Sequence, residues 1–172
     1  MDKICSSCNF KDYKIFCDTG LCIDRKLALN ASLGFLGKNS MLINEKYGSY
    51  FFISYALLHE DLDKTKNTAQ KMCIGCNKCI KSCPGGAIKD GGKININKCI
   101  SHITQKKGEL YLKEKSLIKK GGLAFGCDIC QDVCPHNKDI EKTKIDLFLK
   151  NRILSSVSPP CRLFRTYYIR TF

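Results

Sequence analysis

Two cysteine runs constrain this chain more than any other feature of its sequence. The first has the spacing CxxCxxCxxxCP and the second repeats most of it, and their cysteines are Cys73, Cys76, Cys79, Cys83, Cys127, Cys130 and Cys134. In bacterial two-cluster ferredoxins this spacing wraps three thiolates around one 4Fe-4S cluster and sends the fourth to a second cluster. Two zinc sites usually show separated CxxC pairs, and a disulfide framework would imply secretion. The runs therefore predict an iron-sulfur protein.

The second run lacks its first cysteine, because Ala124 stands at that position. An unassigned cysteine, Cys99, lies upstream, and we expect it to supply the missing ligand. The crossover rule of two-cluster ferredoxins then predicts two 4Fe-4S clusters. The first ligand set is Cys73, Cys76, Cys79 and Cys134. The second ligand set is Cys83, Cys99, Cys127 and Cys130.

Composition bounds the compartment and the partners of the chain. Its 172 residues suffice for one ordinary domain or two small ones, and thirteen cysteines without an apolar signal segment indicate reduced thiols in the cytoplasm. The longest apolar stretch, residues 50–58, is too short to span a bilayer, so we expect no membrane association. The formal charge is +13. Its lysines fit either a solvated face or a phosphate-binding surface, and both interpretations stay open.

The pattern along the chain predicts an α/β segment before the cysteine-rich part. A strand is expected over residues 12–18, a helix over 23–31, a glycine-punctuated loop over 34–39, and strands at 41–43 and 50–58 joined by a turn at 44–48. A polar linker over 60–71 leads into loops and short helices. A helix is expected over 138–149. The basic aromatic end, residues 162–170, fits either stacking on nucleic acid or a disordered terminus.

Several separate motifs between residues 12 and 137 follow one another in a known order. They are Cys17-Asp18-Thr19-Gly20, Asp24-Arg25, Leu33 to Asn39, Leu42-Ile43, Gly48 to Phe52, the first cysteine run, Cys99-Ile100-Ser101, and Phe125 to Pro135. In this order and with these residues the chain resembles epoxyqueuosine reductases. The resemblance implies reduction of epoxyqueuosine to queuosine in tRNA, with two 4Fe-4S clusters and cobalamin as cofactors.

The resemblance also implies roles for particular residues and partners. Asp18 is the expected proton donor, since the departing epoxide oxygen must be protonated. Gly37, Lys38, Asn39 and Ser101 are the expected cobalamin contacts. The implied partners are tRNA carrying epoxyqueuosine and an electron donor such as flavodoxin or ferredoxin.

The implied fold is α+β, with three parts. Residues 1–62 would be a partial α/β cobalamin-binding segment, residues 63–140 a bacterial two-cluster ferredoxin-like domain, and residues 141–172 a helix with a disordered basic tail. Relatives have a substantial segment before the strand that carries Asp18, so the resemblance implies a truncated member of the family. Leu21 replaces a proline of the relatives, and His136 replaces an aromatic residue.

Other functions stay open. The chain could be a non-catalytic dicluster electron carrier, an inactive truncated fragment of the reductase, or a cobalamin reductase or dehalogenase-like protein acting on a small molecule rather than tRNA. The remaining cysteines could form a third metal site or serve as small apolar residues, and they are Cys5, Cys8, Cys17, Cys22 and Cys161.

Overall fold

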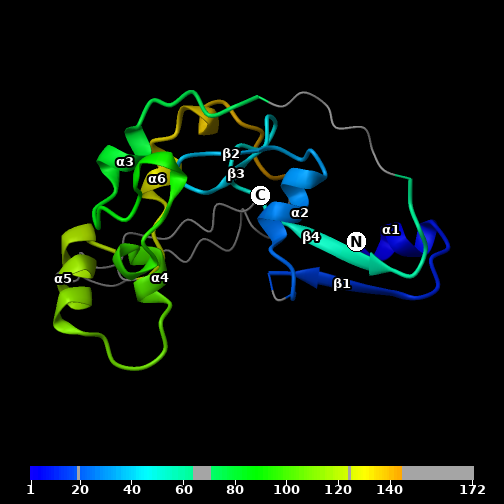
Figure 1. The fold of residues 1–172 in the computed structure, drawn as a ribbon, viewed down its shortest axis with the longest axis horizontal. Coiled ribbons are helices and arrows are strands. Elements are labelled where there is room, and N and C mark those ends of the chain that lie inside the picture. Colours follow the sequence, from blue (N-terminus) through cyan, green and yellow to red (C-terminus); the bar gives the residue numbers. More distant parts are fainter. Residues whose placement is uncertain (19, 64–70, 124, 145–172) are drawn as a thin grey trace.

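A computed structural model describes residues 1–18, 20–63, 71–123 and 125–144, which form short helices and two small sheets. The elements are α1 (Asp2–Ser7), β1 (Tyr13–Cys17), α2 (Asp24–Asn30), β2 (Phe35–Leu36), β3 (Leu42–Ile43), β4 (Ser54–Leu58), α3 (Lys78–Ser82), η1 (Asp90–Gly92), η2 (Ile96–Lys98), α4 (Ile100–Thr104), α5 (Leu112–Gly121), α6 (Ile129–Asp132) and η3 (Pro135–Asn137). Figure 1 shows the ribbon of β1 and β4 at one end, helices α3 to α6 at the other, and α2, β2 and β3 between them. The mixture of helix and strand agrees with the predicted class.

The ribbon at the N-terminal end pairs two strands that are distant in the sequence. β1 runs antiparallel to β4, with Tyr13 opposite Leu58 and Cys17 opposite Ser54. The ring of Phe16 stacks on that of its cross-strand neighbour Tyr55, with 5.2 Å between the ring centroids. Aromatic pairs of this kind stabilise two-stranded ribbons. The strand predicted over residues 12–18 is confirmed as β1.

The strands expected at 41–43 and 50–58 do not pair with each other. β3 pairs with β2, whereas the second strand begins only at Ser54 and pairs with β1. The predicted turn between them is present, because the Asn44 side chain accepts the backbone N–H groups of Lys46 and Tyr47 at 2.9 and 3.2 Å. Gly48 closes it with φ of 60°, a left-handed conformation that favours glycine.

The helix predicted over residues 23–31 is confirmed as α2, and it packs toward β3. Ala28 on this helix is buried, as its helical spacing predicted. Gly34 follows the helix, and a side chain at that position would collide with the carbonyl oxygen of Ile43. The glycine therefore permits the close approach of the loop to β3 as well as ending the helical pattern.

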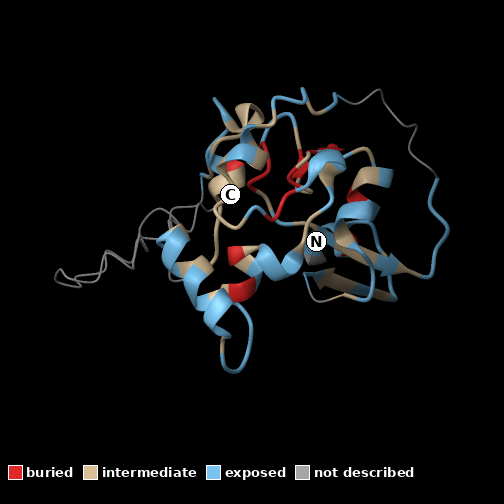
Figure 2. Ribbon diagram, turned by 60° about the vertical axis from the view of Figure 1, so that its left-hand side comes forward, coloured by how far each residue is buried: buried red, intermediate tan, exposed pale blue. Residues whose placement is uncertain are grey.

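Buried residues gather in two places (Figure 2). The group around β2 and β3 includes the apolar residues Phe35, Leu42, Ile43 and Tyr50, and the group between α4 and α5 includes Ile100, Ile103 and Leu123. Both groups are small. The cysteine-rich part therefore has little apolar burial of its own.

The cysteine-rich part consists of loops and short helices, as predicted. Its longest helix in the described residues, α5, has ten residues. The Glu114 carboxylate accepts the Tyr111 N–H at 2.8 Å at the start of α5, and Gly122 ends it with φ of 65°. Within the described part of the chain, no helix combines the length and the apolar composition needed to cross a membrane.

The helix expected over residues 138–149 does not begin in its described part, residues 138–144. Asp139 has φ of 56°, which interrupts a right-handed helix. The segment instead lies along the turn after β3, where the Glu141 N–H donates to the Lys46 carbonyl at 3.1 Å and the two side chains pair at 3.0 Å. The rest of the expected helix and the basic aromatic end lie outside the described residues.

Candidate metal centre

The thiols of the first predicted ligand set line one hollow that is partly open to solvent. Short local elements bring them there. Cys79 lies in the first turn of α3, whose N-cap residue Asn77 has a left-handed φ of 57°. Cys134 is the N-cap residue of η3, and Pro135 then turns the chain away from the hollow. Cys73 and Cys76 come from the extended segment before α3.

The thiols of the second predicted set sit at the ends of other short helices. Cys83 is the C-cap residue of α3 and its sulfur accepts the Ala87 N–H at 3.3 Å. Cys99 is the N-cap residue of α4. Cys130 lies in α6, which packs against α3, and Cys127 precedes that helix. Each of the helices α3 and α6 therefore carries or adjoins thiols of both ligand sets. Because the two helices are in contact, each ligand set can take thiols from both cysteine runs.

The thiols that raise one another's pKa fall into two groups. Burial raises the pKa of the Cys79 thiol, and the nearby Cys73 and Cys76 thiols add to the rise. Burial also raises the pKa of Cys134, and the thiols that add to it are Cys79, Cys73 and Cys76. Thiolates repel one another, so these contributions report proximity. The four thiols thus form one group.

The second group shows the same behaviour. Burial raises the pKa of Cys127, with Cys99 and Cys83 adding to the rise. Burial raises the pKa of Cys130 to about 12, and the contributing thiols are Cys127, Cys83 and Cys99. These neighbours all belong to the same predicted ligand set. The structure therefore brings these four thiols together as a second group, and their ligation of a cluster stays a prediction.

The donor chemistry of both groups fits iron-sulfur clusters. Thiolates are soft ligands, and four per cluster is the usual ligation of a 4Fe-4S centre. Bound cations reverse the repulsion described above, because a coordinating thiol is deprotonated outright. In the described residues, no three His, Cys, Asp or Glu side chains stand close enough to hold a single ion. Thiols arranged around a centre of several atoms are spaced more widely than ligands of one ion.

The loop expected to contact cobalamin lines the hollow of the first thiol group. Lys38 donates from Nζ to Asn77 Oδ1 at 2.8 Å and to Asp90 Oδ1 at 3.0 Å. The Asn39 side chain is buried and donates from Nδ2 to the Cys130 carbonyl at 3.3 Å. A side chain at Gly37 would meet Asn39 and Ile43. These contacts fasten the loop to the cysteine-rich part.

Ser101, the fourth expected cobalamin contact, lies elsewhere. It is the second residue of α4, two residues after Cys99, and its Oγ accepts Gln105 Nε2 at 3.1 Å. Ser101 therefore belongs to the surroundings of the second thiol group, whereas Gly37, Lys38 and Asn39 line the first. The four residues lie at two different groups.

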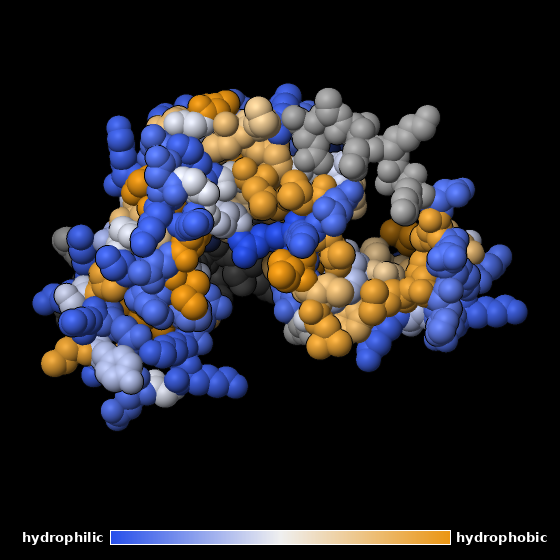
Figure 3. All heavy atoms as spheres, viewed as in Figure 1, coloured by the Kyte–Doolittle hydropathy of each residue, from blue (hydrophilic) through white to orange (hydrophobic). Residues whose placement is uncertain are grey.

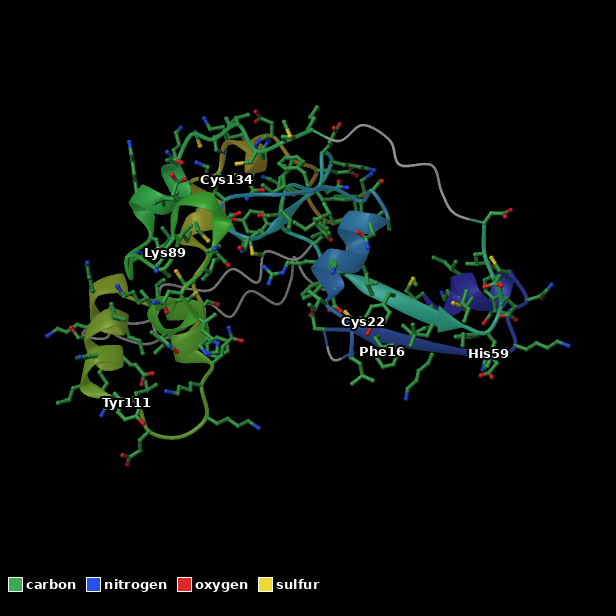
Figure 4. All side chains as sticks on the ribbon, viewed as in Figure 1. Phe16, Cys22, His59, Lys89, Tyr111 and Cys134 are labelled. Carbon is green, nitrogen blue, oxygen red and sulfur yellow. The ribbon has the colours of Figure 1, made fainter. Side chains whose placement is uncertain are left out.

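Asp18, the expected proton donor, stands at the end of β1 and does not line the thiol hollow. It is exposed and has φ of 59°, a conformation that aspartate tolerates better than most residues. Tyr55 anchors the loop that follows, because its hydroxyl lies against Gly20 and accepts the Cys22 N–H at 3.4 Å. Figure 4 shows Cys22 near Phe16 and well separated from Cys134.

Sequence reasoning missed a polar network that joins the N-terminal segment to the second cysteine run. The buried Ser49 hydroxyl donates to Gln131 Oε1 at 2.8 Å and accepts Asn137 Nδ2 at 2.8 Å. Asn137 Oδ1 accepts the Ser49 N–H at 2.7 Å, and the Tyr50 hydroxyl donates to Asp132 at 2.6 Å. Asn137 directly follows the second run, which was the one available signal.

Sequence reasoning also left His136 without a role. It lines the first hollow, and its ring meets that of Phe35 edge-on at 5.0 Å. Its Nε2 atom is buried and has no hydrogen-bond partner among the residues that the structure describes. Among the remaining cysteines, Cys5 is buried and Cys8, Cys17 and Cys22 are exposed, while Cys161 lies outside the described residues.

Comparison with known proteins agrees with this geometry. Residues 72–137 match the 4Fe-4S double cluster binding domain, a segment that contains both thiol groups. The chain is 42% identical over 128 residues to the epoxyqueuosine reductase of Francisella cf. novicida, covering 73% of this chain and 35% of that protein. The resemblance stated from the motifs is confirmed, because its curated relatives are epoxyqueuosine reductases.

Solved structures lead to the same family. An epoxyqueuosine reductase crystallised with a tRNA-Tyr epoxyqueuosine-modified stem loop is 35% identical, with a TM-score of 0.71, and covers 83% of this chain and 37% of that one. The Bacillus subtilis enzyme, solved with an aspartate catalytic loop swung out of the active site, is 33% identical, with a TM-score of 0.66, and covers 81% and 36%. The chain thus spans about a third of the length of the relatives it matches.

Proposed function

We propose that this relative of the epoxyqueuosine reductases takes part in reducing epoxyqueuosine to queuosine in tRNA and passes electrons through two 4Fe-4S clusters. One observation carries the proposal. The eight thiols divide into two crossed groups of four within the segment that matches the double cluster domain. The chain would act in the cytoplasm, where thiols stay reduced.

The proposed ligands are the two sets predicted from the spacing. Cys73, Cys76, Cys79 and Cys134 would hold one cluster, and Cys83, Cys99, Cys127 and Cys130 the other. Such clusters pass one electron at a time, and removing the epoxide oxygen as water takes two electrons and two protons, so two successive transfers would be needed. Helices α3 and α6 are in contact and carry thiols of both groups, so an electron that reduces one cluster could pass directly to the other.

Asp18 is the proposed proton donor. Its carboxyl group stands at a strand end on an exposed loop anchored by Tyr55, where it can meet a large substrate such as tRNA. The solved Bacillus subtilis relative with an aspartate catalytic loop swung out supports a donor on a loop that moves. A positioned acid is worth about 10²–10⁴ in rate.

Cobalamin remains part of the proposal through the resemblance. When bound it supplies a low-valent metal for opening the epoxide. The side-chain groups of Lys38 and Asn39 are used within the protein, so they do not fit the expected bonds to the ring's amides as they stand. In this loop the backbone at Gly37 would contact the cobalamin. Ser101, beside the second thiol group, would supply the other contact.

A second candidate function is electron carriage without catalysis. It is favoured by the fact that all eight proposed ligands lie between residues 73 and 134, so both clusters need no residue of the N-terminal segment. Against it, hydrogen bonds from Asn39, Ser49 and Tyr50 fasten that segment to the second cysteine run. A plain electron carrier needs no such attachment.

The experiment uses the full chain, reconstituted anaerobically with iron and sulfide, supplied with cobalamin and titanium(III) citrate, and incubated with epoxyqueuosine-containing tRNA. Nucleosides from digested tRNA are then analysed by mass spectrometry. Formation of queuosine supports the reductase. Full cluster loading and reduction without queuosine favours the electron carrier, and failure to load about eight irons contradicts both functions.

A further inference from the structure

The largest share of the positive charge of this chain, six of the 13 net charges, lies in residues 93–123. Residues 1–62 contain seven basic and seven acidic side chains, so this part is balanced. Residues 93–123 contain eight lysines against two glutamates. All eight lysines are exposed. Among the ion pairs of the described residues, Lys106 is the one lysine of this segment with a partner, Glu114, at 2.8 Å. The surplus therefore faces solvent.

The basic segment covers the second thiol group. Cys99 starts α4, and α4 packs on α5, with Gly121 lying directly against Ile100. The Gly126 N–H donates to Thr104 Oγ1 at 2.8 Å, which ties the turn before Cys127 to α4. A partner seated on α4 and α5 would thus be close to the second group.

This surface lies at the opposite end of the molecule from the loop of Asp18. Figure 4 places Tyr111, before α5, far from Phe16 and Cys22, and Figure 3 shows the α4 and α5 end as mostly hydrophilic. Cys99 of the second thiol group is the N-cap residue of α4, whereas neither α4 nor α5 contributes a residue to the lining of the first hollow. An electron entering at this end would therefore reach the second group before the first.

The composition of the surface favours an acidic protein over a nucleic acid. Residues 93–123 contain no arginine, the residue best suited to bidentate phosphate contacts, and lysine acts as a hydrated point charge suited to steering. Tyr111 and Leu112 are 73% and 84% exposed, they lie between Lys107 and Lys113 in the sequence, and Lys106 Nζ lies 5.0 Å from the centroid of the Tyr111 ring. An apolar centre with a charged rim suits a small, weak interface of the kind that electron-transfer proteins form.

We propose that the surface of α4 and α5 around Tyr111, here called the lysine surface, docks an acidic one-electron carrier protein that reduces the second cluster. The inference rests on the proposed function, since it requires that the clusters be present. The carrier loses one electron and the cluster gains it, and no bond is formed or broken. The lysines steer the encounter and the apolar centre makes the contact.

The experiment measures how fast reduced flavodoxin, an acidic one-electron carrier, reduces the clusters of the full chain in anaerobic stopped flow. The test variant carries Lys107→Glu, Lys113→Glu and Lys115→Glu, which lie within four residues of Tyr111 in the sequence and avoid the pair of Lys106 and Glu114. Glutamate at position 113 also suits the first turn of a helix. Iron content checks cluster loading, and if loading falls, the same three lysines are changed to glutamine.

A matched control changes the same total charge at the other end of the molecule, through Lys3→Glu, Lys11→Glu and Lys14→Glu on α1 and near β1. We expect the bimolecular rate at low salt to fall at least about tenfold in the test variant, since electrostatic steering is worth about 10–10³. The control should change less than about twofold, and its rate should keep the salt dependence of the unchanged protein. Reduction by titanium(III) citrate should be equal in all three proteins.

Three results would overturn the inference. One is an unchanged flavodoxin rate in the test variant, and another is an equal loss in both variants, which would indicate a general charge effect. The third is loss of tRNA stem-loop binding with the flavodoxin rate retained, which would make the lysine surface an RNA site. Failure of the proposed function looks different, because clusters would then be reduced at full rate by flavodoxin while no queuosine forms.

Discussion

Replacing Asn137 by alanine tests whether the polar network holds the N-terminal segment onto the cysteine-rich part. The asparagine side chain accepts the Ser49 N–H at 2.7 Å and donates to Ser49 Oγ and the Gln131 carbonyl, both at 2.8 Å. Removing three hydrogen bonds of about 1 kcal/mol each, and leaving their partners partly unsatisfied, should lower the free energy of opening this segment by about 2–4 kcal/mol. That is a large fraction of an ordinary domain's stability.

Amide hydrogen exchange on the cluster-loaded protein measures this loss directly, because metal-bound proteins rarely unfold in a single step. The protection of the Ser49 and Tyr50 amides should fall about 30- to 700-fold, the factor that corresponds to 2–4 kcal/mol. The exposed Asn30 on α2 is the matched control, and Asn30→Ala should change the protection of the Ser49 and Tyr50 amides less than about threefold.

A second variant tests whether the network acts as a unit. Ser49→Ala removes the hydroxyl that joins Gln131 to Asn137. Combined with Asn137→Ala, its effect should be less than additive by about 1–2 kcal/mol, because the two side chains share a bond. Additive effects, or unchanged protection at Ser49 in the Asn137→Ala variant, would show that the segment is held by other contacts.

Three further predictions concern the thiols, the acid and the start of α5. Cys99→Ala should lower iron from about eight to about four per chain and leave the spectrum of one cluster, and unchanged iron would remove Cys99 from the ligand set. Asp18→Asn should keep clusters and cobalamin while queuosine formation falls about 10²–10⁴-fold, and a near-normal turnover rate would reduce Asp18 to a turn residue. Lys106 holds the pKa of Glu114 below its usual range, so the stability that Glu114 gives α5 is complete above about pH 4.3 and is lost as pH falls through that lower pKa. Hydrogen exchange of α5 from pH 5 to 3 should show this loss in the unchanged protein and not in Glu114→Gln, and equal acid sensitivity would contradict it.

The parts of the structure that the sequence predicted are those fixed by local spacing. The first cysteine run groups its thiols through turns of a few residues, and the helical spacing of Ile23, Leu27, Ala28 and Ala31 is enough to place α2. Cys99 was assigned by the vacancy at Ala124, and its grouping with Cys127 and Cys130 in the structure supports that assignment. Ligation of iron by these thiols remains a proposal.

The parts that the sequence did not predict depend on distant partners. Nothing in the residues around Ser54 indicates that β4 pairs with β1 rather than with β3, because alternation fixes a strand's faces and not its neighbour. Ser49 and Asn137 are ordinary surface residue types whose burial follows from meeting each other. The helix expected from residue 138 fails because Asp139 adopts a left-handed conformation, which helical periodicity does not reveal.

The pairing of β1 with β4 has a consequence for the order in which the chain folds. Its innermost pair, Cys17 and Ser54, closes a loop made of residues 18–53. Closing a flexible loop of that length costs about 3 kcal/mol, so the ribbon gains stability only after α2, β2 and β3 have condensed and shortened the distance. Asp18 is the first residue of that loop. The carboxyl group proposed to deliver the proton is therefore expected to be among the last to reach its place.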